Sequence, residues 1–198
     1  MLFEIGAFRH VDRVWRQFMG PDVANCSEHT FRVAWVALTL ARYETKTKND
    51  IDIEKLLKIA LIHDLAESRC GDVHYLSRQY VERKETDAIK DIFEGTCFGK
   101  EMEEIIKEYE DRKTIESRIV KDADNIDVEL ELREMTSRGQ SLGVLWNKRR
   151  QKMVQPKLYT DAARKFWKDI RKADPHDWHS LSTKNRFQGG DWVFKARP

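Results

Sequence analysis

The sequence predicts an all-α protein, a bundle of helices around one core. No proline lies between Pro21 and Pro156, so long stretches contain no residue that breaks a helix. Glycine is also sparse, at 9 of 198 residues, which leaves few signals for turns. Apolar residues recur at helical spacing, whereas the alternation typical of half-buried strands is essentially absent.

Several expected helices have end signals. Ser27 precedes the apolar run FRVAWVALTLA and is expected to cap its helix, and Asp52 is expected to cap the next one. The helix after Ser27 is apolar on nearly every side, which predicts a central position in the core, whereas the helix after Thr114 is more charged and is expected to be half-exposed. Gly139 and Gly143 indicate a turn after that helix. The expected helices span residues 3–18, 28–43, 53–67, 78–95, 100–111, 114–136, 142–152 and 159–173.

Composition narrows the function classes. Lys and Arg number 36 against 34 Asp and Glu, a net charge of +2, which argues against binding to a nucleic acid polymer. Cys26, Cys70 and Cys97 are odd in number and form no CxxC pair, so we expect a reducing, cytoplasmic location. No leader peptide is visible, and the most apolar segment, residues 33–41, is too short to cross a membrane. We expect one domain over residues 1–175 and an aromatic tail, packed or partly mobile, over 176–198.

Four residues combine metal-binding side chains with buried helix stripes. His29 aligns with apolar positions of its helix, and the adjacent His63 and Asp64 each align with an apolar row of theirs. Asp124 lies in the same row as Val120 and Val128. Because a buried carboxylate must be paired, hydrogen-bonded or metal-bound, the set is a sensible nitrogen and oxygen site for a divalent metal.

Each of these residues also has a structural interpretation. A single histidine on an apolar face is more often a hydrogen-bonded core residue than a ligand, and an adjacent His-Asp pair occurs by chance in many proteins. The metal-site hypothesis therefore depends on the combination and on the segments around it.

Three segments carry a family resemblance: SEHTFRVA at 27–34, ALIHDLAESRCGD at 60–72 and IVKDADNID at 119–127. In order and spacing they resemble the HD-domain metal-dependent phosphohydrolases, and most closely the small 5'-deoxynucleotidase branch. The resemblance implies an HD-domain helical bundle that binds one divalent metal ion (Co, Mn, Zn, Ni, Mg or Fe). It assigns the metal ligands as His29, His63, Asp64 and Asp124. Asp122 is the rival to Asp124, but two residues away on a helix it points to a different side.

The resemblance also suggests catalytic and substrate-binding residues. Glu67 follows Asp64 by three residues and His63 by four, so we expect all three to share one helix face, and the family places its acid/base there. Asp72 is expected at the sugar or phosphate side, with a cap or turn as the alternative.

Among Arg9, Arg13 and Arg16, the family spacing favours Arg13 for phosphate, with Trp15 against the sugar or base. His74 and Tyr75 stand where the family more usually has a proline-bearing turn. The basic run KRRQK at 148–152 is expected to be a solvated helix face, with contact to an anion or a partner chain as the alternative.

The function that follows is hydrolysis of deoxynucleoside 5'-monophosphates to inorganic phosphate. One alternative keeps the site but hydrolyses nucleoside triphosphates or other phosphoesters, and another is an inactive module that binds nucleotide. We also expect a homodimer, because one domain has limited room to bury every large side chain of the C-terminal third. These side chains are Trp146, Phe166, Trp167, Trp178, Trp192 and Phe194.

Overall fold

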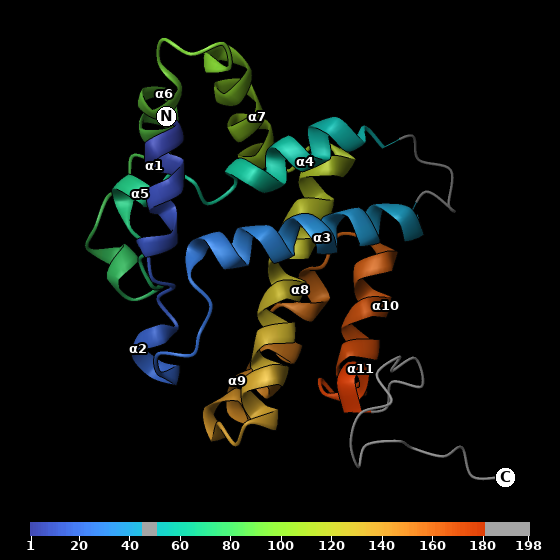
Figure 1. The fold of residues 1–198 in the computed structure, drawn as a ribbon. Coiled ribbons are helices and arrows are strands. Elements are labelled where there is room, and N and C mark those ends of the chain that lie inside the picture. The colour runs from blue at the N-terminus through green and yellow to red at the C-terminus, as the bar shows by residue number, and fades with distance from the viewer. Residues whose placement is uncertain (45–50, 181–198) are drawn as a thin grey trace, which may run out of the picture.

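The computed structural model describes residues 1–44 and 51–180, and over these ranges the elements are helices, as the sequence predicts (Figure 1). Trp192 and Phe194, and most of the expected tail, lie outside the described residues. The α-helices are α1 (Leu2–Ala7), α2 (Arg16–Met19), α3 (Cys26–Glu44), α4 (Ile53–Ile62), α5 (Glu67–Cys70), α6 (Glu85–Phe93), α7 (Gly99–Asp111), α8 (Ile115–Ser137), α9 (Ser141–Met153), α10 (Asp161–Ile170) and α11 (Asp177–Ser180).

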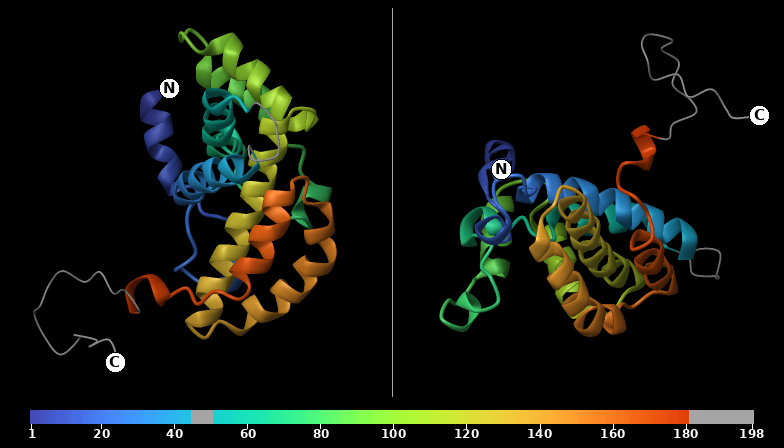
Figure 2. Two further views of the ribbon diagram at one scale, coloured as in Figure 1. Left: turned by 90° about the vertical axis from the view of Figure 1, so that its right-hand side faces the viewer. Right: turned by 90° about the horizontal axis from the view of Figure 1, so that it is seen from below.

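The centre of the bundle is α8 rather than α3. Helix α8 packs against α3, α4, α7, α9 and α10, and α3 crosses it near its middle (Figures 1 and 2). The expectation of a half-exposed α8 is therefore wrong. Its charged residues are buried with partners: Asp127 with Arg32, for example, and Glu129 with Arg150. Burial of a charge is tolerated when it is paired and hydrogen-bonded, and hydropathy alone does not register such pairing.

The N-terminal segment is not the single helix expected over 3–18. After α1 and a 3₁₀ turn at Phe8–His10, the chain becomes extended at Val11, whose carbonyl accepts a hydrogen bond from Cys26 N. Val14 N donates to Asp72 Oδ2 at 2.8 Å. These tertiary hydrogen bonds replace helical ones, so the segment lies across the start of α3.

Two further helix boundaries differ from expectation. The helix expected over 53–67 stops at Ile62, and His63–Ala66 form tight turns before α5. The helix expected over 78–95 begins only at Glu85, after a 3₁₀ turn at Ser77–Gln79. No proline or glycine marks either break.

The helix caps are partly as expected. Asp52 accepts a hydrogen bond from Lys55 N, as predicted. Ser27 is not the cap, because α3 already begins at Cys26. Asn25 caps the helix instead, and its Oδ1 accepts a hydrogen bond from Glu28 N at 2.9 Å. Glu28 Oε2 in turn accepts a hydrogen bond from Asn25 N, which completes a reciprocal capping arrangement.

The turn between α8 and α9 is set by one of the two glycines. Gly139 has a φ of +91°, which glycine adopts without strain, so the predicted turn is confirmed there. Gly143 instead lies inside α9. A Cβ at that position would meet Thr136 Oγ1 at 2.4 Å and the Leu132 carbonyl at 3.1 Å, so its role is close packing of α9 on α8.

Within residues 1–44 and 51–180, no helix is both long enough and apolar enough to cross a bilayer. Several aromatic side chains of the C-terminal third pack within the chain. Trp167 is fully buried, Trp146 packs edge-on against Trp15, and Phe166 packs against Tyr43. Trp178 is 79% exposed.

Candidate functional site

Two imidazoles and a carboxylate meet where α3 and the turn after α4 face each other. One donor atom from each of His29, His63 and Asp64 lies within 4.8 Å of the others. The two Nε2 atoms are 3.4 Å apart, and each is 3.3 Å from Asp64 Oδ2. Asp124 joins them from α8, with its Oδ1 3.3 Å from His29 Nε2. All four residues expected from the sequence are therefore neighbours.

Both imidazoles are oriented by hydrogen bonds on their other nitrogen. His29 Nδ1 donates to Asp127 Oδ2 at 2.6 Å, and His63 Nδ1 donates to the Ala60 carbonyl at 2.8 Å. In the neutral form, each Nε2 then carries a lone pair toward the cluster. Metal-binding histidines are commonly fixed in this way by a carboxylate or a backbone carbonyl. The donor set therefore fits a divalent transition metal ion.

The electrostatics of the cluster favour a positive charge at its centre. Burial and the nearby Arg13 lower the pKa of His29, but hydrogen bonds to the carboxylates outweigh them, so this pKa lies well above its usual range. Burial raises the pKa of Asp124, yet the charge of Lys121 and the hydrogen bond with His29 hold it well below its usual range. The pKa of Asp64 is also held well below its usual range, because burial is outweighed by both histidines.

Asp122, the rival candidate, lies away from the cluster. Its carboxylate accepts hydrogen bonds from Tyr159 N at 2.9 Å, and from Thr160 N and Thr160 Oγ1, both at 2.8 Å. It therefore anchors the chain at the start of α10. The helical geometry that separated it from Asp124 is confirmed.

Glu67 and Asp72 reach the cluster from the irregular segment after α4. The expectation that His63, Asp64 and Glu67 share one continuous helix face is wrong, because α4 ends first. The turn nevertheless brings Glu67 to the wall of the cavity beside Asp64. Burial raises the pKa of Glu67 to about 9, with Asp64 and Asp72 adding to the effect, so Glu67 is protonated at neutral pH.

The side chain of Asp72 has a structural contact that the sequence left open. Its Oδ2 accepts the hydrogen bond from Val14 N and lies 3.9 Å from Arg13 Nε. Asp72 therefore fastens the segment that carries Arg13 and Trp15. Asp72 also lines the cavity. Its position is therefore compatible with both expectations, a structural residue of the turn and a residue beside the substrate.

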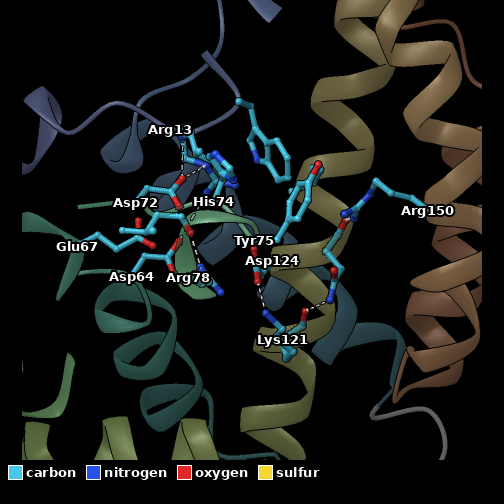
Figure 3. Close-up of a pocket in the computed structure, with 15 residues that line it drawn as sticks. Arg13, Asp64, Glu67, Asp72, His74, Tyr75, Arg78, Lys121, Asp124 and Arg150 are labelled. Carbon is cyan, nitrogen blue, oxygen red and sulfur yellow. Dashed lines mark hydrogen bonds and ion pairs between the residues drawn. The ribbon is translucent and has the colours of Figure 1, made fainter. Parts of the chain in front are cut away.

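These groups border a cavity of about 240 Å³ (Figure 3). Arg13 is 6% exposed, and its Nη1 lies 3.6 Å from Asp64 Oδ2. Trp15 lines the cavity, and its buried indole N–H has no hydrogen-bond partner among the residues that the structure describes. The expected residues that border this space are Arg13, Trp15, Asp64, Glu67, Asp72 and Asp124, whereas His29 and His63 are not among its lining residues.

Three cations of the cavity were not singled out from the sequence. Lys121 donates to Asp124 Oδ2 at 2.7 Å, and its spacing of three residues from Asp124 was a usable signal. Arg78 belongs to the segment that was expected to be helical. Arg150, expected on a solvated face, bonds Glu129 Oε1 at 2.8 Å and reaches the cavity from the side opposite Arg13 (Figure 3). The periodicity of α9 gave no sign of this.

Comparison with known proteins identifies the family. The family model described as the HD domain matches residues 5–166. The chain belongs to the HD-domain family. The 5'-deoxynucleotidase HDDC2 of Danio rerio is 31% identical over 140 residues, covering 66% of this chain and 65% of that protein. The 5'-deoxynucleotidase HDDC2 of Dictyostelium discoideum is 36% identical over 115 residues, or 54% of this chain and 60% of that protein.

The alignments with these two relatives cover 65% and 60% of their lengths, so this chain spans less than two thirds of each. Among solved structures, a conserved hypothetical protein of Pyrococcus furiosus superposes with a TM-score of 0.70 at 27% identity. That match covers 87% of this chain and 98% of the other. The predicted HD-domain helical bundle is thus confirmed.

Proposed function

We propose that this HD domain is a metal-dependent phosphohydrolase that removes phosphate from deoxynucleoside 5'-monophosphates. The observation that carries the proposal is the convergence of two pre-oriented imidazoles and two ionised carboxylates on a cavity that also holds Glu67 and Arg13. The two relatives named as 5'-deoxynucleotidases support this substrate class.

His29, His63, Asp64 and Asp124 would hold one divalent metal ion. When bound, such an ion polarises a phosphate oxygen and lowers the pKa of a water molecule. Arg13 is buried beside Asp64, so it can bind the phosphate oxygens with charge-assisted hydrogen bonds. The identity of the ion remains among Co, Mn, Zn, Ni, Mg and Fe.

Glu67 is placed to move the proton that the reaction requires. Water forms a bond to phosphorus, the bond from phosphorus to the 5'-oxygen breaks, and the departing oxygen takes the proton of Glu67. The proton that the water loses then restores Glu67. Trp15 and Asp72 face the nucleoside part of the cavity, where Trp15 provides an aromatic surface for the sugar or base.

A nucleotide panel tests the function. The full chain is incubated with deoxynucleoside and ribonucleoside mono- and triphosphates and each candidate metal, and released orthophosphate, pyrophosphate and triphosphate are measured. We expect orthophosphate from the deoxynucleoside monophosphates. Triphosphate release from nucleoside triphosphates would support the alternative hydrolase, whereas nucleotide binding without turnover would support the inactive module.

We also propose that the protein is cytoplasmic and that its three cysteines are reduced. We further propose that it forms a homodimer, with the interface at the N-terminal face. An apolar hollow of about 400 Å³ there is lined by Leu2, Phe31, Leu61 and Phe98, which are 40–74% exposed. Exposed apolar patches commonly mark interfaces. Light scattering tests this: the wild type should show twice the chain mass, and Phe31→Glu with Leu61→Lys should show a monomer. A monomer mass for the wild type at micromolar concentration would contradict the proposed homodimer.

A further inference from the structure

Beside the donor cluster lies a second cavity, of about 150 Å³, which is lined in part by His63 and Asp64 and to which the proposed reaction assigns no ligand. It shares Asp64, Glu67, Arg78 and Lys121 with the first cavity, so these residues separate the two spaces. Its far side is formed by Tyr109, Glu110 and Arg112 at the end of α7, and by Arg83 and Glu85 before and at the start of α6.

The charges of this cavity are unequally paired. Arg83 pairs with Glu85, and its Nη1 also lies 3.8 Å from Glu67 Oε1. Lys121 pairs with Asp124. Among the described residues, neither Arg78 nor Arg112 forms an ion pair within 4 Å. Arg78 Nε donates to the Val73 carbonyl, whereas the buried Nη1 of Arg112 has no hydrogen-bond partner. Glu110 lines the cavity two residues before Arg112 and is exposed.

Arg112 is held in place at some conformational cost. Its φ is +53°, the left-handed region that side chains with a Cβ rarely adopt, and glycine is the usual residue at such a helix end. The guanidinium stacks on the Tyr109 ring, 3.5 Å from the ring centre. Tyr109 in turn contacts His63 edge-on, with ring centres 5.8 Å apart. One aromatic ring thus links Arg112 to the donor cluster.

We propose that this second cavity binds inorganic phosphate released by hydrolysis, with Arg112 as the cation that receives it. This inference rests on the proposed function. In phosphoryl transfer, the attacking and leaving oxygens lie roughly in line across phosphorus. With the nucleoside on the Trp15 side, the attacking water and the freed phosphate are on the side of the second cavity. An unpaired guanidinium N–H is suited to a phosphate oxygen.

Glycine at position 112 gives a clean test, because Arg112→Gly removes the guanidinium and relieves the φ of +53°. The thermal midpoint should therefore not fall. Arg112→Gln keeps most of the side-chain size and serves as the second variant. Lys113→Ala is the matched control, since Lys113 is 78% exposed, pairs with Asp111 and lies outside the cavity.

Two measurements are made on the full, metal-loaded chain. Calorimetric titration with inorganic phosphate should show binding to the wild type and to Lys113→Ala, with affinity lowered about tenfold in both Arg112 variants. The ratio of the phosphate inhibition constant to the KM of the nucleotide should rise by a similar factor in those variants.

The titration needs no turnover, so it separates this inference from the proposed function. Equal phosphate affinity in the wild type and Arg112→Gly would overturn the assignment, even in an active enzyme. An inactive enzyme that still binds phosphate through Arg112 would keep the site and refute the hydrolysis. Tripolyphosphate is titrated in parallel. If the affinity for tripolyphosphate falls more than the affinity for orthophosphate when Arg112 is replaced, the cavity holds the outer phosphates of a substrate, and the product assignment is overturned.

Discussion

The first cavity has two walls that are built in different ways: a donor wall, which carries the proposed metal ligands, and a facing wall, formed by residues 73–78. On the donor wall, the hydrogen bond between His29 and Asp127 joins residues that are 98 positions apart in the chain. On the facing wall, Leu76 N donates to His74 Nδ1 and Arg78 Nε donates to the Val73 carbonyl, within five residues of chain. Tyr75 is 72% exposed. Long-range bonds hold the reacting groups rigidly, whereas the substrate-facing residues can adjust with little cost to the fold.

Removal of a donor should have the largest effect. His63→Ala or Asp124→Ala is expected to lower the metal content from about one ion per chain to near zero and to abolish turnover, because each removes a proposed ligand. Elemental analysis of the purified proteins measures this. His10→Ala, an exposed histidine away from the cluster, is the control and should keep its metal. Undiminished metal in both donor variants would contradict the assigned ligands.

Glu67→Ala should separate chemistry from ligation on the same wall. We expect normal metal content and fold, with turnover lowered by roughly 10²-fold or more, because a positioned proton donor is lost. Steady-state kinetics and metal analysis are run on the same preparation. Wild-type turnover in this variant would remove Glu67 from the mechanism.

Asp72 connects the two walls, so its removal should have an intermediate effect. Asp72→Ala leaves the Val14 N–H without its acceptor and frees the segment of Arg13 and Trp15. A lost partner of this kind costs about 1–3 kcal/mol, so kcat/KM should fall roughly tenfold. Asp72→Asn retains an acceptor and should recover part of the loss. If both variants behave alike, the charge of Asp72 is what matters.

Arg150→Ala should affect stability more than chemistry. Burial raises the pKa of Glu129 and Arg150 lowers it, with a net increase. An acid whose pKa is higher in the folded state loses stability as pH rises from its unfolded pKa to its folded pKa. Without Arg150 the folded pKa rises further, so the destabilisation should be small at pH 5 and about 3 kcal/mol at pH 8.

Thermal unfolding of Arg150→Ala at the two pH values measures the difference. Lys148→Ala, on the exposed face of α9, is the matched control and should show no such pH dependence. An equal loss of stability at pH 5 and pH 8 would mean that Glu129 does not titrate in this range.

The sequence predicted the donor wall better than the facing wall, for a physical reason. His29 and Asp124 stand on long helices whose apolar periodicity predicts that both side chains are buried, and the resemblance to the HD-domain phosphohydrolases implied that they share a metal. The breaks at His63 and before Glu85 could not be anticipated, because neither proline nor glycine marks them, and the turns there are closed by short local hydrogen bonds such as that from Leu65 N to the Ile62 carbonyl. Arg150 was missed because its burial depends on pairing with Glu129, and a charge run in a sequence does not show its partner.

Gly143 extends this contrast to a position outside both walls. It allows α9 to lie close against α8, and α9 is the helix that carries Arg150 to the mouth of the cavity. A larger side chain at 143 would push the two helices apart and widen the mouth without altering any residue that lines it. Substitution at this one backbone contact is therefore a route by which an HD domain of this shape can change the size of the ligand it admits while the residues that line its cavity stay the same.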